Sequence, residues 1–318
     1  MLKENFPHLP QLVLPGYQIT YSSSGGTFVA KIVAQIPKIL RAISRERQWL
    51  REMQAVHQFD LVISDNRYGL KIDGLQSVIM THQLQIMTGF GSTADNVMRK
   101  LHYRMLEKFD ACWVVDEQDN GLAGALSHPM QLPANAHYIG LLSQLQPPAS
   151  AVKPEPKCVL ALLSGPEPMR GILEEKLLQQ ASSITDYQFH IIAGNPTGSA
   201  RTHLPPHMRY ASHASANELA NALARAELVV CRSGYSTLMD LATLGKKALL
   251  IPTPGQSEQE YLAAHLQVQG IALCRQQAAL NLKKDVTEAL HYAGFPTRVQ
   301  GTGLMQKVID DSLRRLKN

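Results

Sequence analysis

Short apolar runs alternate along the whole chain with longer segments in which apolar residues recur every three or four positions. The short runs have the length and the β-branched content of buried strands, and the longer segments have the period of amphipathic helices. This alternation predicts an α/β fold with parallel sheets. The longest uninterrupted apolar runs are about strand length, far below the roughly 18 residues that a membrane-spanning helix needs.

Two halves can be separated by this pattern. In the first half it predicts strands at 11–14, 60–64, 77–81, 112–115 and 137–139, and long helices at 28–54 and 95–108. A segment with four prolines and almost no periodicity, 143–156, follows and indicates an interdomain linker. In the second half it predicts strands at 158–163, 188–192, 208–211, 228–231, 248–251 and 271–274, and helices at 217–224, 235–244 and 258–267.

We therefore expect a first α/β lobe at 1–145, a linker at 146–156, a second lobe at 157–300 and a terminal helix at 301–318. Two such lobes would place a ligand site between them, at the carboxyl ends of the strands.

Charge and cysteine content narrow the class of protein. The 318 residues include 31 Lys and Arg against 26 Asp and Glu, a net charge of +5 that is too diffuse to predict nucleic-acid binding but suits a phosphate-bearing substrate. The cysteines lie far apart in or beside strand-like runs, which predicts reduced thiols in a cytosolic protein. These cysteines are Cys112, Cys158, Cys231 and Cys274.

Residues 1–7 show no signal-peptide pattern.

The most informative motif is a turn between the predicted strand 228–231 and the helix that begins at Tyr235. Such a turn aims the free N–H groups and the positive dipole end of the helix at a ligand, which suits a phosphate or diphosphate. Gly234 lets the ligand approach the backbone. The alternative is a set of ordinary cap residues. The hydroxyl donors of this turn are Ser233, Ser236 and Thr237.

Two further groups of polar residues accompany this turn. Asp240 lies six residues beyond Gly234 and could reach a ribose hydroxyl, although a solvated helix residue is the plainer interpretation. Gln259 and Glu260 lie at the start of the next helix, where an amide and a carboxylate can bracket sugar hydroxyls. The alternative for Glu260 is a capping box with Ser257.

Segments 230–245 and 248–263, which contain these residues, resemble the donor-sugar half of the GT-B glycosyltransferases. They are similar in particular to the peptidoglycan-type N-acetylglucosaminyltransferases with a family 28 C-terminal domain. The resemblance implies two Rossmann-like lobes, with the turn Arg232, Ser233 and Gly234 on the donor diphosphate. It also implies Asp240 on the ribose and the Gln259–Glu260 pair on the sugar. The family usually has Glu in place of Asp240, and its lipid II enzyme has a second Gln in place of Glu260.

The resemblance implies two more donor contacts in the second half. Ser164 and Gly165 occupy the position of a loop that closes on the diphosphate, and Arg170 follows as a phosphate contact or, equally, a surface arginine. His213 matches a region whose backbone contacts uracil.

The first lobe of a GT-B enzyme binds the acceptor and supplies a base. Asp65 and His82 each follow a predicted strand and are the candidates for this general base. A turn-forming aspartate and a hydrogen-bonded structural histidine are the alternatives.

The resemblance also implies a missing piece. Family members open with a strand, a glycine-rich loop, a helix and a second strand, whereas Gly25 and Gly26 lie in a serine-rich loop before a helix. We therefore expect a truncated first lobe without its opening β-α-β unit. The helix at 28–54 carries six basic residues against one acidic between Lys31 and Arg51, which suits an anionic membrane surface or, alternatively, a solvated face of a core helix.

These observations predict a metal-independent, inverting hexosyl transfer from a UDP-sugar, GlcNAc-like by resemblance, to an unknown acceptor for which a lipid-linked alcohol is a candidate. No cofactor and no nucleic-acid partner are expected, and the location is cytoplasmic with peripheral membrane association as an option. A UDP-sugar 2-epimerase and a non-catalytic nucleotide-sugar-binding protein remain alternatives. A serine hydrolase is disfavoured because Cys231 and Tyr235 stand where its elbow needs Gly. A zinc site at His203, His207 and His213 is disfavoured by irregular spacing.

Overall fold

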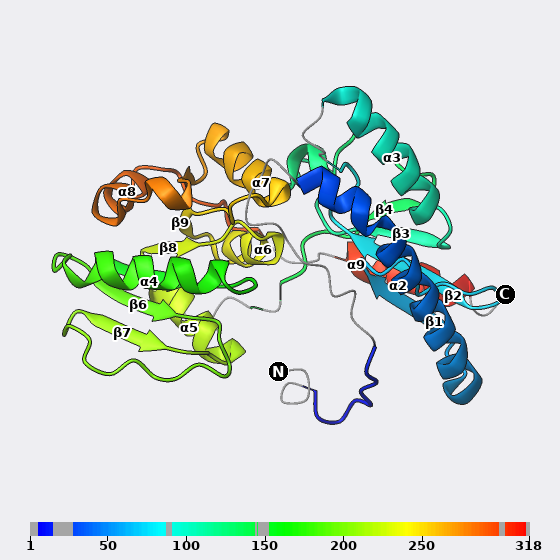
Figure 1. Cartoon of the computed structure of the whole chain (residues 1–318), viewed down its shortest axis with the longest axis horizontal. Coiled ribbons are helices and arrows are strands. Elements are labelled where there is room, and N and C mark those ends of the chain that lie inside the picture. Colours follow the sequence, from blue (N-terminus) through cyan, green and yellow to red (C-terminus); the bar gives the residue numbers. More distant parts are fainter. Residues whose placement is uncertain are drawn as a thin grey trace.

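The computed structural model describes residues 6–14, 28–86, 91–143, 145, 153–298 and 303–315. They form two α/β lobes, which lie side by side in Figure 1. The division into two lobes agrees with the predicted fold class.

The first lobe is built on a parallel four-stranded sheet in the order β1-β2-β3-β4. Its central strands are buried because apolar residues of β2 and β3 face other elements on both sides. The strands are β1 (Leu61–Asp65), β2 (Gln76–Thr81), β3 (Ala111–Val114) and β4 (Ala136–Tyr138). The helices are α2 (Phe28–His57), α3 (Ser92–Leu106) and the short 3-10 helix η2 (Gly124–Leu126).

One predicted strand of this lobe is wrong. Residues 11–14 form no strand, and Val13 is 89% exposed. An apolar run becomes a strand only where a neighbouring edge accepts its hydrogen bonds, and no strand of the described sheets pairs with it. The other four predicted strands of the first half are confirmed to within a few residues.

Helix α2 is fixed to the sheet at its C-terminal half. Leu50 is buried against Ile72 and Leu75 of the loop between β1 and β2. Glu46 on the same helix is buried, pairs with Arg67 and accepts a hydrogen bond from the Gly69 N–H at 3.1 Å. This helix therefore holds the loop that follows β1.

The second lobe is built on a parallel six-stranded sheet in the order β10-β9-β8-β5-β6-β7. The strands are β5 (Cys158–Leu162), β6 (Gln188–Ile192), β7 (Met208–Ala211), β8 (Leu228–Cys231), β9 (Lys247–Leu250) and β10 (Leu273–Cys274). The helices are α4 (Met169–Ser182), α5 (Ala216–Arg225), α6 (Tyr235–Leu244), α7 (Ser257–Val268), η3 (Gln277–Ala279) and α8 (Leu282–Ala289). The strands and helices predicted for the second half are confirmed, with shifts of a few residues.

Alternate residues of these strands pack into two separate cores. On one face, Val159 and Ile191 join Leu173 of α4 and Val286 of α8. On the other face, the core includes helices α5, α6 and α7 and continues into buried residues of the first lobe, such as Trp113. The boundary between the lobes is therefore in part an apolar core.

The last helix, α9 (Leu304–Arg315), lies on the side of the first lobe in Figure 1. Its Val308 and Ile309 pack against the core that the two lobes share. Just before it, the Arg298 N–H bonds to the Ala242 carbonyl of α6, while the Arg298 side chain reaches Glu117 of the first lobe. The chain thus crosses between the lobes a second time. Within the described ranges, no helix has the length and apolar character needed to cross a membrane.

Candidate functional site

The turn between β8 and α6 leaves the start of the helix open. Gly234 is the N-cap of α6, and no side chain caps the helix there. A methyl group built on Gly234 would meet no atom within 4 Å, so the space over its Cα is empty. Because the first N–H groups of a helix have no partner inside it, this end offers donors and positive potential to an anion.

The hydroxyls of this turn do not all face that space. Ser233 is fully buried, and its Oγ donates to the Gln259 carbonyl at 2.7 Å. Ser236 is exposed and Thr237 is half-buried. Ser233 therefore ties α6 to α7, and Ser236 and Thr237 are the hydroxyls that a ligand can reach.

Arg232 lies beneath the turn and is 1% exposed. Its guanidinium donates to the Ile251 and Pro252 carbonyls at 3.1 Å, to the Met169 carbonyl at 2.8 Å and to Gln277 Oε1 at 2.7 Å. Burial lowers the pKa of this group to about 10. The structure corrects the expectation that Arg232 cradles the diphosphate: its hydrogen bonds go to loops of the protein.

The start of α7 carries the predicted sugar-binding pair. Gln259 Oε1 accepts from the Thr253 N–H at 2.9 Å, and Glu260 Oε1 accepts from the Gly255 N–H at 3.0 Å. The N-cap of α7 is Gln256 without a side-chain cap bond, so the capping box between Ser257 and Glu260 is wrong. Both side chains shape the loop before α7, and Glu260 is also exposed.

Asp240 lies on α6 and is mostly buried. Its Oδ1 accepts a hydrogen bond from Ser143 Oγ at 2.5 Å. Burial raises the pKa of this carboxyl, and the Ser143 bond lowers it in part. Asp240 is therefore not a solvated helix residue, and its partner comes from the end of the first lobe.

The loop before α4 is exposed from Ser164 to Pro168, with Gly165 at a φ of +102°. Arg170, by contrast, is buried and pairs with Glu167 and Glu174. These carboxylates raise the pKa of its guanidinium against the effect of burial, which lowers it. The surface-arginine interpretation is wrong. The pairing with two carboxylates also disfavours the predicted phosphate contact.

His213 follows β7, as predicted. It lines a pocket of about 360 Å³ between α5 and strands β5, β6 and β7. Within the described ranges no three His, Cys, Asp or Glu side chains gather closely enough to hold a metal ion, so the zinc alternative has no support there.

The two candidate bases differ in their surroundings. Asp65 is the last residue of β1 and is exposed. His82 follows β2, and its Nε2 lies 2.8 Å from Glu258 Oε1 of α7. The His82 ring also stacks on the Tyr235 ring, with centroids 4.1 Å apart. The carboxyl end of β2 thus meets the starts of α6 and α7.

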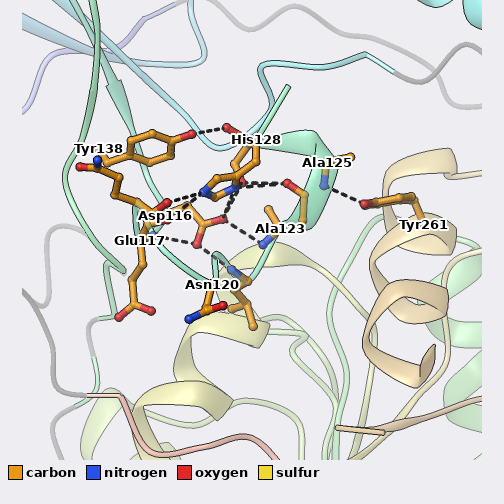
Figure 2. Close-up of polar contacts among 12 residues, drawn as sticks. Asp116, Glu117, Asn120, Ala123, Ala125, His128, Tyr138 and Tyr261 are labelled. Carbon is orange, nitrogen blue, oxygen red and sulfur yellow. Dashed lines mark hydrogen bonds and ion pairs between the residues drawn. The ribbon is translucent and has the colours of Figure 1, made fainter. Parts of the chain in front are cut away.

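A buried carboxylate that the sequence did not single out holds the loop after β3 (Figure 2). Asp116 is fully buried and accepts from the N–H groups of Leu122 and Ala123 and from Ser127 Oγ, at 2.8, 3.0 and 2.6 Å. The Ala125 N–H of this loop donates to the Tyr261 hydroxyl of α7 at 2.8 Å. Asp116 directly follows the strand that the sequence predicted at 112–115, and that position was the signal available in the sequence.

Comparison with known proteins agrees with this architecture. Residues 170–297 match the model of the glycosyltransferase family 28 C-terminal domain. The UDP-N-acetylglucosamine--N-acetylmuramyl-(pentapeptide) pyrophosphoryl-undecaprenol N-acetylglucosamine transferase of Pasteurella multocida (strain Pm70) is 28% identical over 162 residues, 48% of this chain and 46% of that protein. The transferase of the same name from Methylorubrum extorquens (strain PA1) is 44% identical over 84 residues, 26% of this chain and 23% of that protein. The matched part of the chain spans less than half the length of these relatives.

Solved structures extend the likeness to both lobes. The spinosyn rhamnosyltransferase SpnG complexed with thymidine diphosphate has a TM-score of 0.61 at 15% identity, over 94% of this chain and 85% of that one. MurG of Acinetobacter baumannii has a TM-score of 0.51 at 18% identity, over 87% of this chain and 78% of that one. At these identities the likeness shows the fold. The chain has the two-lobed GT-B fold of glycosyltransferases, and most of its second lobe is similar to the glycosyltransferase family 28 C-terminal domain.

Proposed function

We propose that this chain transfers a sugar from a UDP-sugar to an acceptor hydroxyl. The observation that supports this most is the uncapped start of α6 with empty space over Gly234, inside the segment that matches the family 28 domain. An anionic diphosphate fits such a helix end, and the diphosphate is the leaving group of the proposed reaction.

The donor is proposed to lie along α6 and α7. Its diphosphate contacts the α6 N–H groups, Ser236 and Thr237, and its ribose contacts Asp240. Its sugar contacts Gln259 and Glu260. A GlcNAc-like sugar is proposed because the matched relatives are named as UDP-N-acetylglucosamine-dependent transferases.

The chemistry proposed for this site is a single displacement with inversion. A first-lobe base removes the proton of the acceptor hydroxyl while the acceptor oxygen attacks the anomeric carbon. The bond from that carbon to the diphosphate breaks, and UDP leaves with the bonding electrons. Negative charge develops on the diphosphate, where the α6 N–H groups stabilise it.

A lipid-linked acceptor is the finer proposal. The Pasteurella multocida relative is named for a pyrophosphoryl-undecaprenol acceptor. On α2, Lys38, Arg41 and Arg45 are exposed, as is Leu40 at 58%. Exposed cations beside an apolar side chain suit an anionic membrane surface, where such an acceptor would reside.

Calorimetric titration of the chain with UDP, UDP-GlcNAc and TDP tests the donor site. The sharpest variant is Gly234→Ala, because its φ of −69° and its empty surroundings allow a methyl group without strain. We expect a melting temperature lowered by a few degrees at most, because Ala is a poorer N-cap than Gly. UDP binding should weaken at least about tenfold, or about 1.4 kcal/mol, because the methyl group occupies the phosphate position. Equal UDP affinity of the wild type and Gly234→Ala would contradict the proposal, as would absence of UDP binding by the wild type.

A product assay separates transfer from the alternatives. The chain is incubated with UDP-GlcNAc alone, and the sugar is followed by NMR. A C2-epimerised sugar would indicate the epimerase. Binding without UDP release, when a membrane lipid extract is added, would indicate a non-catalytic binding protein.

A further inference from the structure

His82 belongs to the first lobe, but its ring is held by the second. Nε2 lies 2.8 Å from Glu258 Oε1, in the first turn of α7. The ring stacks on Tyr235, the first residue of α6, with an interplanar angle of 10°. Across the part of the chain that the structure describes, no first-lobe group is hydrogen-bonded to this ring.

The two holding residues differ in how firmly they are placed. Tyr235 is 4% exposed and packs in the core that the lobes share. Glu258 is about one-third exposed, and the His82 side chain is 17% exposed. The pair is thus supported from one side and open to solvent on another, which is the placement a proton-transferring group needs.

The contact also fixes which nitrogen of the ring can accept a proton. An ionised carboxylate only accepts hydrogen bonds, so Nε2 carries the hydrogen that faces Glu258. In the neutral ring the lone pair is then on Nδ1.

We propose that Glu258 and Tyr235 position His82 as the general base, so that the base is completed by residues of the opposite lobe. This rests on the proposed function. In the reaction, Nδ1 takes the proton of the acceptor hydroxyl as the acceptor oxygen bonds to the anomeric carbon and UDP departs. Glu258 stabilises the imidazolium that forms. Because Glu258 immediately precedes Gln259 and Glu260, the same turn of α7 holds the base and the sugar.

Asp65 has no corresponding support. It is exposed at the end of β1, and the described structure gives it no hydrogen bond to the second lobe. Its carboxylate would have to be oriented by the substrate alone.

The test measures UDP release from UDP-GlcNAc with water as the acceptor, and the imidazole tautomer of His82 by ¹⁵N NMR. We expect His82→Asn to lower kcat about 100-fold and Glu258→Gln to lower it about tenfold, with the KM for UDP-GlcNAc unchanged. Glu258→Asp should restore part of kcat. The matched control is Ser257→Ala, which changes the neighbouring side chain of the same turn and should leave kcat at the wild-type value.

The NMR experiment uses His82→Asn to assign the signal. We expect Nε2–H in the wild type and a mixture of tautomers in Glu258→Gln. A change in KM alone would make the pair a lobe-to-lobe latch and overturn the proposal. UDP release that is equal in the wild type and both variants, zero included, would also overturn it. The UDP titration reports separately: if the wild type does not bind UDP, the proposed function itself fails.

Discussion

The substitution Ser143→Ala, which removes one hydroxyl outside the second lobe, should strengthen UDP binding. Ser143 Oγ donates to Asp240 Oδ1 at 2.5 Å, on the carboxylate proposed to hold the ribose. The 2′ and 3′ hydroxyls of a ribose can occupy both carboxylate oxygens, and on Oδ1 the ribose hydroxyl would compete with Ser143 for space and for the negative charge, even though one carboxylate oxygen can accept two hydrogen bonds. In Ser143→Ala, the carboxylate would have no such bond to lose when UDP arrives.

The size of the effect follows from the bond. A hydrogen bond between a hydroxyl and a charged group contributes about 1.5–3 kcal/mol. If half of this, about 0.75–1.5 kcal/mol, is recovered on binding, the Kd for UDP falls about three- to twelvefold, since about 1.4 kcal/mol corresponds to a factor of ten. Ser143→Thr, which keeps the hydroxyl, should bind UDP as the wild type does, and Asp240→Asn should bind more weakly.

Calorimetry at pH 7.5 would measure these constants, with a melting curve for each variant. Unchanged or weaker UDP binding by Ser143→Ala would refute the reasoning, because it would mean that ribose and Ser143 do not compete for Asp240. Burial raises the pKa of Asp240, so this carboxylate takes up a proton at a higher pH than an exposed aspartate does. On acidification, UDP binding by the wild type should therefore begin to weaken at that higher pH.

Two further predictions concern stability. Burial lowers the pKa of His102 to about 4, and its ring is 4% exposed. Because the unfolded ring binds a proton near pH 6.5, the free energy of unfolding is highest above that pH and falls by about 3 kcal/mol in total as the pH drops to 4. Urea unfolding at several pH values should show this slope reduced in His102→Gln, and an equal slope in the variant would contradict it. Arg232→Met leaves four neutral acceptors without their donor. Because one unsatisfied buried acceptor costs about 1–3 kcal/mol, the second lobe should lose at least that amount, visible as a lower urea midpoint; a midpoint like that of the wild type would show that these bonds contribute little.

The sequence predicted those parts of the fold that depend on neighbours close along the chain. The strand ending at Cys231, the turn at Gly234 and the helix from Tyr235 were confirmed, because the apolar run, the glycine of the turn and the helical period are all local features of the sequence. Residues 11–14 misled because a strand also needs a partner edge, which an apolar run does not specify.

The sequence placed the candidate residues at strand ends and helix starts, but it did not give their hydrogen-bond partners. Arg232 stands in the expected motif, yet its hydrogen bonds reach residues up to 63 positions away. The pairing of His82 with Glu258 joins residues 176 positions apart, and only the packing of the two lobes brings them together. The contacts that Ser143, Asp116 and Glu258 make therefore could not be obtained from local patterns.

The return of α9 to the side of the first lobe joins the two halves at a second place, by packing in addition to the covalent linker. A body joined at one point can swivel about any axis, whereas one joined at two points is restricted to rotation about the line through them. Any opening between the lobes should therefore be a rotation about one axis, in which His82 moves along a restricted path relative to α6 and α7. A protease cut just before α9 should leave the lobes covalently joined through the interdomain linker, whereas a cut in that linker should leave two fragments held together only by non-covalent packing.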